Sequence, residues 1–496
     1  MSFDRREAVA FAALALAALL TWALVPTYPD YDAYHHLLWG RDLVRGVQPG
    51  FETFAAPTEH PLYLALCALL SLAGDGADRL LVLVTVLSLV ALTAGSYALG
   101  RALFGVGPAG AGALFVGSSF AFLLYAVRAF VDVPFLALVV WAAALEAARP
   151  RRGLAPMALL AAAGLLRPEA WVLAALYWLW CLRGRAVGQR VGLLALVVLA
   201  PLVWALVDLA VTGDPLYSLH ATNDLAARLG RERGIAHVPS AFVTYLADVA
   251  RPPVAAAGVA GLVLGVRRFG WAAMAVPLAL VGAGALTFVG TGIAGLSIIQ
   301  RYLTVPAVAL CVLAGYALLG FTSLGPGPWR TCWRAAAWGG VAVGIAFLAL
   351  KAASFGRLGA ELRFIGSTHA QLRTLLDARV VRESMRCDPV DAVGALTFPT
   401  YRLVPDARWM LDVGPSRVRS RAEDPRRGGV DVYIGGNRLV VDGDKFARRF
   451  GRADGVSRET NDFPGGTPAL RSGPFTVYVA RRPDRAGRCR ARRAAG

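Results

Sequence analysis

Residues suited to chemistry gather in one polar stretch near the start of the sequence. It contains Asp30 and Asp32, then His36, and further along Glu59 and His60. Two carboxylates separated by one residue, shortly after an apolar run, can bind a divalent cation or supply a general base. Either aspartate could instead cap the helix expected after it, because Asp before an apolar-periodic stretch is a common helix start. The density of histidine and glutamate in the same stretch favours the functional interpretation.

Three shorter polar clusters interrupt the apolar sequence further along. Arg128 and Asp132 are four residues apart and could form a structural ion pair. Arg167 and Glu169 flank a proline at the edge of an apolar run, where charges are costly unless they are paired or functional. Arg301 precedes another run. Its guanidinium can bind a lipid phosphate through two parallel hydrogen bonds, or it can be an interfacial anchor whose charged end snorkels to water.

The composition decides what kind of scaffold holds these residues. The chain has 496 residues, of which 56% are hydrophobic and 17% charged, and its mean hydropathy is +0.53. These values exclude a soluble globular enzyme and indicate a polytopic membrane protein. The net charge of +18 would suggest nucleic acid in a soluble protein. Here we expect no nucleic acid partner, because basic residues flank the cytoplasmic ends of membrane spans and meet anionic membrane lipids.

Hydropathy places the spans, which need about 20 residues of helix each. The run at 60–73 is short by that measure and begins with His60-Pro61. It could be a short span or a helix lying along the membrane surface. The other apolar runs lie at 8–26, 79–100, 108–127, 134–148, 153–166, 170–182, 191–211, 253–266, 271–289, 302–320 and 335–352.

The distribution of arginine sets the orientation. If the N-terminus is cytoplasmic and 60–73 does not cross, every short basic cluster falls on the cytoplasmic side. Those clusters are Arg101; Arg149, Arg151 and Arg152; Arg183, Arg185 and Arg190; Arg267 and Arg268; Arg330 and Arg334. The rule therefore predicts about 11 spans, a juxtamembrane helix at 60–73 and an extracytoplasmic C-terminus in a multi-pass plasma-membrane protein. All the polar clusters described above then face outside.

The composition changes at about residue 354. The tail, 354–496, is rich in Arg, Asp, Gly and Pro and contains alternating strand-like runs at 430–434 and 475–479. It is long enough to have a core of its own, so we expect a small mixed α/β domain after the membrane domain at 1–353. Cys387 and Cys489 are the two cysteines of that tail. An oxidising compartment favours a disulfide between them.

Taken together, the membrane part resembles the GT-C superfamily of polytopic glycosyltransferases, in particular the branch of protein O-mannosyltransferases and aminoarabinose transferase-like enzymes. The matching motifs share one predicted side of the membrane and lie within roughly residues 1–350. They are Asp30-Tyr31-Asp32-Ala33-Tyr34, Glu59-His60-Pro61-Leu62-Tyr63, Asp132-Val133-Pro134, Arg167-Pro168-Glu169 and Arg301-Tyr302-Leu303.

The resemblance implies an α-helical polytopic enzyme that takes a hexose or pentose from a polyprenyl-phosphate carrier. It would transfer that sugar, with inversion, to an extracytoplasmic acceptor such as a lipid, a glycan or a protein. Asp32 or Asp30 would be the general base or a metal ligand, and the sequence departs from the more usual Asp-Glu pair of the family.

The other roles follow from the same resemblance. Arg301, Arg128 and Arg167 would stabilise the leaving phosphate, with His60 and His36 behind them, while Glu59 and Glu169 complete the site. Asp132 would orient groups or, together with Asp30 and Asp32, bind a divalent metal such as Mg or Mn.

Two other classes of protein share some of these features. A polytopic transporter or lipid flippase would also be basic on one side, but it tends to show internal repeats and polar residues at the membrane midplane. A non-catalytic membrane scaffold that presents the C-terminal domain would leave the carboxylates of the first polar stretch unexplained.

Overall fold

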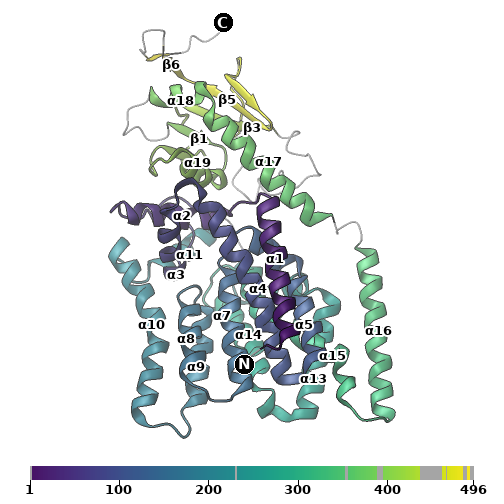
Figure 1. Cartoon of the computed structure of the whole chain (residues 1–496). Coiled ribbons are helices and arrows are strands. Elements are labelled where there is room, and N and C mark those ends of the chain that lie inside the picture. Colours follow the sequence, from purple (N-terminus) through teal and green to yellow (C-terminus); the bar gives the residue numbers. More distant parts are fainter. Residues whose placement is uncertain are drawn as a thin grey trace.

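The computed structural model shows a bundle of helices with a small mixed α/β domain at one end (Figure 1). The described residues are 3–228, 232–351, 356–387, 395–435, 461–464, 466–483 and 489–491. The chain enters at the opposite end of the bundle from that domain, and α1 (Arg5–Leu24) runs toward it. The N-terminus and the C-terminal domain therefore lie at opposite ends of the bundle, as the predicted orientation requires.

Apolar helices of different lengths make up the body of the bundle, and α15 is the most buried of them. They are α1, α4 (Ala77–Phe104), α5 (Val106–Gly117), α6 (Phe120–Val127), α7 (Asp132–Ala148), α8 (Leu154–Gly164), α9 (Glu169–Cys181), α10 (Val187–Thr212), α13 (Pro252–Ala273), α14 (Ala275–Ile293), α15 (Thr304–Leu319) and α16 (Pro328–Leu350).

By length and hydropathy, seven helices of the described residues can cross a membrane, or eight if the bent pair α5–α6 forms one span. This is fewer than the number predicted. The difference lies in α7, α8 and α9, which occupy three of the predicted runs but are shorter than a full span. With 11 residues, α8 rises about 16 Å, against about 30 Å of hydrocarbon.

Short helices cover the end of the bundle that faces the C-terminal domain. Among them α3 (Pro61–Ser71) is too short to cross a membrane, in agreement with the juxtamembrane helix predicted at 60–73. It packs closely on α2 (Tyr31–Val44) at Gly40. A Cβ at Gly40 would lie 2.5 Å from the backbone nitrogen of Ala68, so this approach requires glycine. The other short helices at this end are α11 (Tyr217–Arg228), α12 (Val238–Ala250), η1 (Gly74–Gly76), η2 (Ile235–His237) and η3 (Gln300–Leu303), whereas η4 (Gly320–Ser323) follows α15 at the opposite end of the bundle.

The C-terminal domain is a small mixed α/β fold, as predicted. Its main sheet has the order β2-β1-β3-β5-β4, in which β1 pairs in parallel with β2 and β3, and β5 pairs antiparallel with β3 and β4. The strands are β1 (Leu396–Phe398), β2 (Val418–Ser420), β3 (Val430–Ile434), β4 (Leu470–Ser472) and β5 (Phe475–Val479), with a separate pair β6 (Arg481–Pro483) and β7 (Cys489–Ala491). The helices are α17 (Arg357–Asp377), α18 (Arg379–Arg386), η6 (Tyr401–Leu403) and α19 (Val404–Leu411).

Two further predictions concern this domain. The structure joins Cys387 and Cys489 in a disulfide. The boundary expected between 353 and 354 lies outside the described residues, since α16 ends at Leu350 and α17 begins at Arg357.

The C-terminal domain docks on α2 through ion pairs. Asp412, just after α19, lies 2.8 Å from Arg41 Nη1 and 2.8 Å from Arg45 Nη1. Just before the N-terminal end of α2, the rings of Tyr28 and His369 stack with their centroids 3.3 Å apart. These contacts hold α17 and α19 over the polar loops at this end of the bundle.

Candidate active site

A cavity of about 840 Å³ lies where the helical bundle meets the C-terminal domain. Its size is within the usual range for small-molecule sites. The loops before α2 and α3, together with α9, α10, α11, η3, α17 and α19, supply its walls. The predicted site residues that line it are Asp30, Asp32, His60, Arg128, Arg167, Glu169 and Arg301. The other predicted residues, His36, Glu59 and Asp132, adjoin these residues without lining the cavity.

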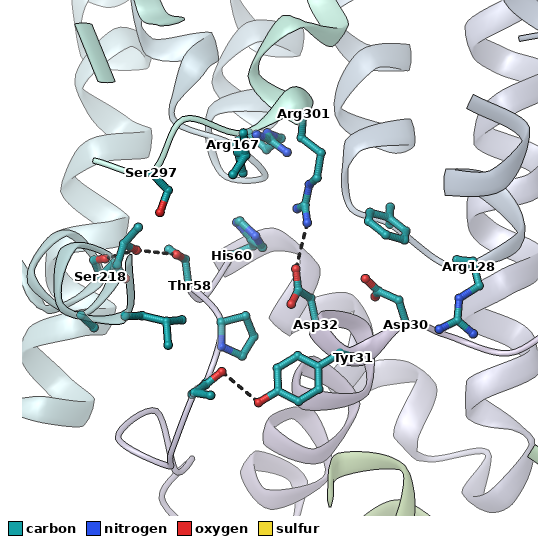
Figure 2. Close-up of a pocket in the computed structure, with 18 of the residues that line it drawn as sticks. Asp30, Tyr31, Asp32, Thr58, His60, Arg128, Arg167, Ser218, Ser297 and Arg301 are labelled. Carbon is teal, nitrogen blue, oxygen red and sulfur yellow. Dashed lines mark hydrogen bonds and ion pairs between the residues drawn. The ribbon is translucent and has the colours of Figure 1, made fainter. Parts of the chain in front are cut away.

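Asp30 both caps a helix and faces the cavity (Figure 2). Its Oδ1 accepts a hydrogen bond of 3.0 Å from the backbone N–H of Ala33, which makes it the N-cap of α2. Its own backbone N–H donates to the carbonyl oxygen of Arg128 at 2.8 Å. Burial, and then the nearby charge of Asp32, raises the pKa of Asp30 to about 7. The capping and functional interpretations of this aspartate are therefore compatible.

Asp32 lies in the first turn of α2 and pairs with an arginine. Its Oδ2 accepts a hydrogen bond of 2.9 Å from Nη1 of Arg301. Burial alone would raise the pKa of Asp32, but the charge and hydrogen bond of Arg301 outweigh it and lower the pKa below its usual value. The two aspartates thus have opposite shifts, so Asp32 stays ionised while Asp30 is poised near neutrality.

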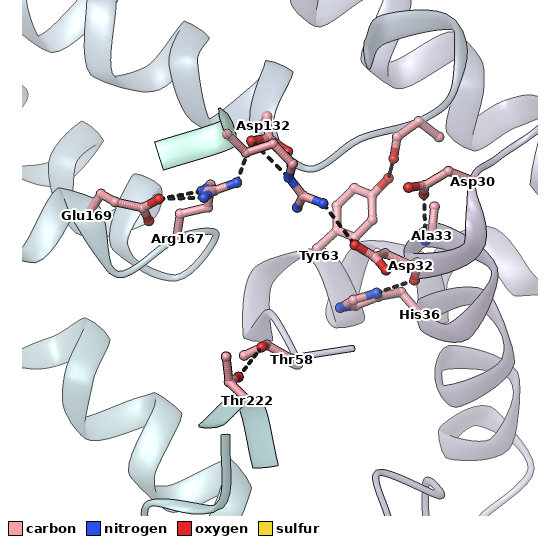
Figure 3. Close-up of polar contacts among 12 residues, drawn as sticks. Asp30, Asp32, Ala33, His36, Thr58, Tyr63, Asp132, Arg167, Glu169 and Thr222 are labelled. Atoms are coloured by element: carbon pink, nitrogen blue, oxygen red, sulfur yellow. Dashed lines mark hydrogen bonds and ion pairs between the residues drawn. The ribbon is translucent and has the colours of Figure 1, made fainter. Parts of the chain in front are cut away.

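Asp32 belongs to a connected set of buried and half-buried charges, which we call the ion-pair cluster (Figure 3): Asp32, Asp132, Arg167, Glu169 and Arg301. Arg301 Nε lies 3.1 Å from Asp132 Oδ2. Arg167 donates to Asp132 through Nη1 and to Glu169 through Nε at 3.0 Å. The Asp132 side chain has no exposed surface and that of Arg167 is 4% exposed. Charges buried to this extent persist only when they are paired, and here they are.

The sequence spacing allowed an ion pair between Arg128 and Asp132, but Asp132 pairs with other arginines. Both of its partners, Arg167 and Arg301, come from distant parts of the chain. Arg128 lies at the cavity wall and donates through Nη1 to the carbonyl oxygen of Tyr28 at 3.0 Å.

The predicted histidines are buried and uncharged. His36 donates through Nδ1 to the carbonyl oxygen of Asp32 at 2.7 Å, and its ring stacks on that of His60. Burial lowers the pKa of His36 to about 4 and that of His60 well below its usual value. Neither ring therefore acts as a cation at neutral pH. Burial likewise raises the pKa of Glu59 to about 9, so this side chain is a neutral acid.

The geometry does not favour the metal site considered for Asp30, Asp32 and Asp132. The guanidinium of Arg301 bridges Asp32 and Asp132, so an arginine takes the position between carboxylates that a cation would need. Within the part of the chain that the structure describes, no three His, Cys, Asp or Glu side chains group as metal ligands.

Comparisons with known proteins were made for the sequence and for the fold. No protein-family model matches the chain, and no curated protein does. Several solved structures are similar to it, and two of them are described here. ArnT from Cupriavidus metallidurans in the apo state is 15% identical, with 95% of this chain and 97% of that chain covered and a TM-score of 0.49. The Archaeoglobus fulgidus oligosaccharyltransferase in the apo form is 13% identical, with 82% and 64% covered and a TM-score of 0.42.

Several residues at the cavity are ones that the sequence did not single out. Thr58 directly precedes Glu59, and Ser297 lies four residues before Arg301, but no pattern in the sequence marks either hydroxyl as functional. The C-terminal domain adds Tyr401, Asp406 and His369. Nothing in the pattern of the tail pointed to them, because their place depends on how the domain docks.

Proposed function

We propose that the chain is a membrane glycosyltransferase that takes a hexose or pentose from a polyprenyl-phosphate carrier. It transfers the sugar, with inversion, to a hydroxyl of an extracytoplasmic lipid, glycan or protein. One observation carries the proposal: a carboxyl with a pKa of about 7, Asp30, shares a cavity with two arginines of the ion-pair cluster. That combination suits removal of a proton on one side and stabilisation of a leaving phosphate on the other.

Asp30 is the proposed general base. The acceptor oxygen attacks C1 of the sugar, and its proton passes to the carboxylate of Asp30. The bond between C1 and the phosphate oxygen breaks, and its electron pair leaves on polyprenyl phosphate. Attack on the face opposite the leaving group inverts the configuration at C1. A base poised near the working pH is effective for such a step, whereas Asp32 is committed to Arg301.

Arg301 and Arg167 are the proposed phosphate-stabilising groups. Arg301 uses Nη1 and Nε for Asp32 and Asp132, and in the described part of the chain no contact engages its Nη2. A phosphate that binds this arginine competes with Asp32 for it. Donor binding is then expected to loosen the Asp32–Arg301 pair. The negative charge of Asp32 is then less neutralised, which raises the pKa of the neighbouring Asp30 and makes it a stronger base.

The position of α10 supports a donor carried in the membrane. Pro201, Trp204 and Ala205 of α10 line the cavity, while Leu202 and Leu206 on the same helix are exposed on the apolar surface. A lipid tail lying along this helix would bring its phosphate to the cavity. The arginine-rich loops at the other end of the bundle support a cytoplasmic N-terminus and an extracytoplasmic C-terminal domain in the plasma membrane.

Membranes that contain the full chain, supplied with labelled polyprenyl-phosphate sugars and extracted envelope acceptors, test the proposal. We expect transfer of label to an acceptor. Asp30→Asn should reduce the rate about 10²- to 10⁴-fold, the usual contribution of a general base. Because Asn is also a good N-cap, this variant keeps the start of α2 intact.

Asp75→Asn is the matched control, since Asp75 is an exposed carboxylate outside the cavity. Transfer that survives Asp30→Asn unchanged would refute the assignment of the base. Absence of transfer from every donor would count against the glycosyltransferase and leave a transporter as the alternative.

A further inference from the structure

One side of the cavity presents hydroxyl groups and a neutral histidine (Figure 2), and the carboxyl group of Asp208, which also lines the cavity, is hydrogen-bonded to one of these hydroxyls. We call it the hydroxyl wall; it consists of Thr58, His60, Ser218, Thr222 and Ser297, all of which line the cavity. In Figure 2 the side chains of His60 and Arg301 lie between the rest of the wall and Asp30. The wall and the proposed base thus face each other across the cavity.

Two buried atoms of the wall lack partners. Ser297 is 1% exposed and His60 is 8% exposed. Among the described residues, neither Ser297 Oγ nor His60 Nδ1 has a hydrogen-bond partner. Buried polar atoms are nearly always hydrogen-bonded, so an exception at a cavity wall calls for an explanation. A ligand in the cavity that carries hydroxyl groups would satisfy both atoms.

The remaining groups of the wall are held in fixed positions. The hydroxyls of Thr58 and Thr222 are 2.8 Å apart, and that of Thr222 also donates to the carbonyl oxygen of Ser218 at 2.6 Å. The hydroxyl of Ser218 is held by Asp208 at 2.9 Å. The segment of Ser297 pairs with Arg233 in an isolated bridge. The wall is therefore built before any ligand binds, which lowers the entropic cost of recognition.

The surroundings of the wall select for a neutral polyol with an apolar face. The His60 ring is neutral because burial lowers its pKa. Trp171 and Trp204 also line the cavity, and both indole N–H groups donate to the carbonyl oxygen of Gly164 at 3.1 Å. Their rings thus offer apolar surface. Hydroxyls beside aromatic carbon match a sugar ring, whereas a phosphate would seek the arginines.

We propose that the hydroxyl wall is the subsite for the sugar ring of the donor, in which Ser297 Oγ and His60 Nδ1 each bond a ring hydroxyl. This inference rests on the proposed function and deepens it, because it assigns sugar recognition to residues separate from those that stabilise the phosphate. The sugar then lies with its phosphate toward Arg301 and C1 within reach of the acceptor that Asp30 activates.

The test compares binding of lipids that differ only in the sugar. The full-length chain in lipid nanodiscs is titrated with bare polyprenyl phosphate and with polyprenyl phosphate carrying mannose, glucose or arabinose. We expect the wild-type chain to bind at least one sugar-bearing lipid more tightly than the bare lipid. Ser297→Ala should weaken the binding of that sugar-bearing lipid about tenfold and leave the affinity for the bare lipid unchanged.

Two further variants make the result decisive. Ser240→Ala removes an exposed hydroxyl outside the cavity and should change neither affinity. If Ser297→Ala does not fold, Ser297→Cys replaces it, because Cys keeps the size of the side chain. It should likewise weaken binding of the sugar-bearing lipid and leave binding of the bare lipid unchanged. Equal weakening of both lipids, no weakening at all, or no preference of the wild-type chain for a sugar-bearing lipid would each overturn the subsite.

The outcome is separable from that of the proposed function. If the chain binds sugar-bearing lipids through the wall but transfers nothing, the subsite is supported and the proposed enzymatic activity is not. A chain that transfers sugar while Ser297→Ala leaves lipid discrimination intact keeps the enzyme and loses the subsite.

Discussion

The ion-pair cluster and the hydroxyl wall occupy the same cavity but satisfy their polar groups in different ways. In the cluster, Arg167 and Arg301 are shared among Asp32, Asp132 and Glu169. In the wall, Ser297 and His60 each keep a buried atom without a partner in the described protein. The cluster also has two buried oxygens without a hydrogen bond, Asp132 Oδ2 and Glu169 Oε2, but each of these carboxylates is already paired with an arginine. The cluster therefore depends on its own members for stability, whereas Ser297 Oγ and His60 Nδ1 have hydrogen bonds left to make. Loss of a cluster residue should damage the fold, and loss of a wall residue should damage recognition alone.

The strongest way to break this contrast is to remove Arg167. Arg167→Gln leaves Glu169 without its cation partner and Asp132 with Arg301 alone, although the side chains of Asp132 and Glu169 are only 0% and 7% exposed. We expect a loss of about 3–5 kcal/mol of stability, as found when one partner of a buried ion pair is removed. The thermal midpoint in detergent, measured beside Ser297→Ala, checks it.

The control for this variant is Arg183→Gln, which changes an exposed arginine of the loop between α9 and α10 and should fall within about 0.5 kcal/mol of the wild type. If Arg167→Gln is as stable as this control, the cluster does not support the fold as proposed.

The second contrast is in the response to pH. Asp30 must be ionised to accept a proton, and its pKa is raised to about 7. We expect kcat/KM to fall about tenfold for each pH unit below that value and to level off above it. The preference among sugar-bearing lipids should stay constant over the same range, because the wall carries no group that titrates near pH 7. A transfer rate that is flat across neutrality would show that Asp30 is not the base.

A smaller effect is expected where the C-terminal domain docks, away from both regions. Asp412 pairs with Arg41 and Arg45, but its side chain is 58% exposed. Asp412→Asn removes the charge and keeps a residue that tolerates the left-handed backbone at this position, where φ is 52°. We expect a loss below about 1 kcal/mol, since exposed ion pairs contribute little. Thermal unfolding at two salt concentrations measures this loss of stability. A larger loss would show that these ion pairs contribute more to docking of the C-terminal domain than exposed pairs usually do.

The smallest expected effect is that of chelation. Arg301 bridges two of the three aspartates that could bind a metal. Treatment with EDTA, followed by addition of Mg or Mn, should therefore leave the transfer rate unchanged. A rate that falls on chelation and returns with either ion would restore the metal site predicted from the sequence.

Much of the fold could be predicted from the sequence because hydropathy and arginine position are strong signals. They indicated the helical bundle, the surface helix at 60–73 and the separate α/β tail. They overestimated the number of full spans, since a short helix such as α8 can lie within a bundle and still read as an apolar run. Apolar runs report burial, whether the neighbour is lipid or protein.

Some features of the candidate site could likewise be predicted from the sequence, and others depend on the packing. The convergence of Asp32, Asp132, Arg167 and Arg301 could be expected from their common side of the membrane, because charges placed there need partners. The neutral state of His36 and His60 could not, since it follows from burial that only the packing reveals. Nor could the roles of Ser297 and Thr222 be predicted, because serine and threonine are common residues and only the packing shows which of their hydroxyls line a cavity.

The cavity is shared between two parts of the chain that pack separately. Asp30 and Asp32 come from the start of α2, whereas Tyr401 and Asp406 come from the C-terminal domain. Release of that domain would remove one part of the cavity lining and leave both aspartates in place, so domain docking and cavity shape are coupled.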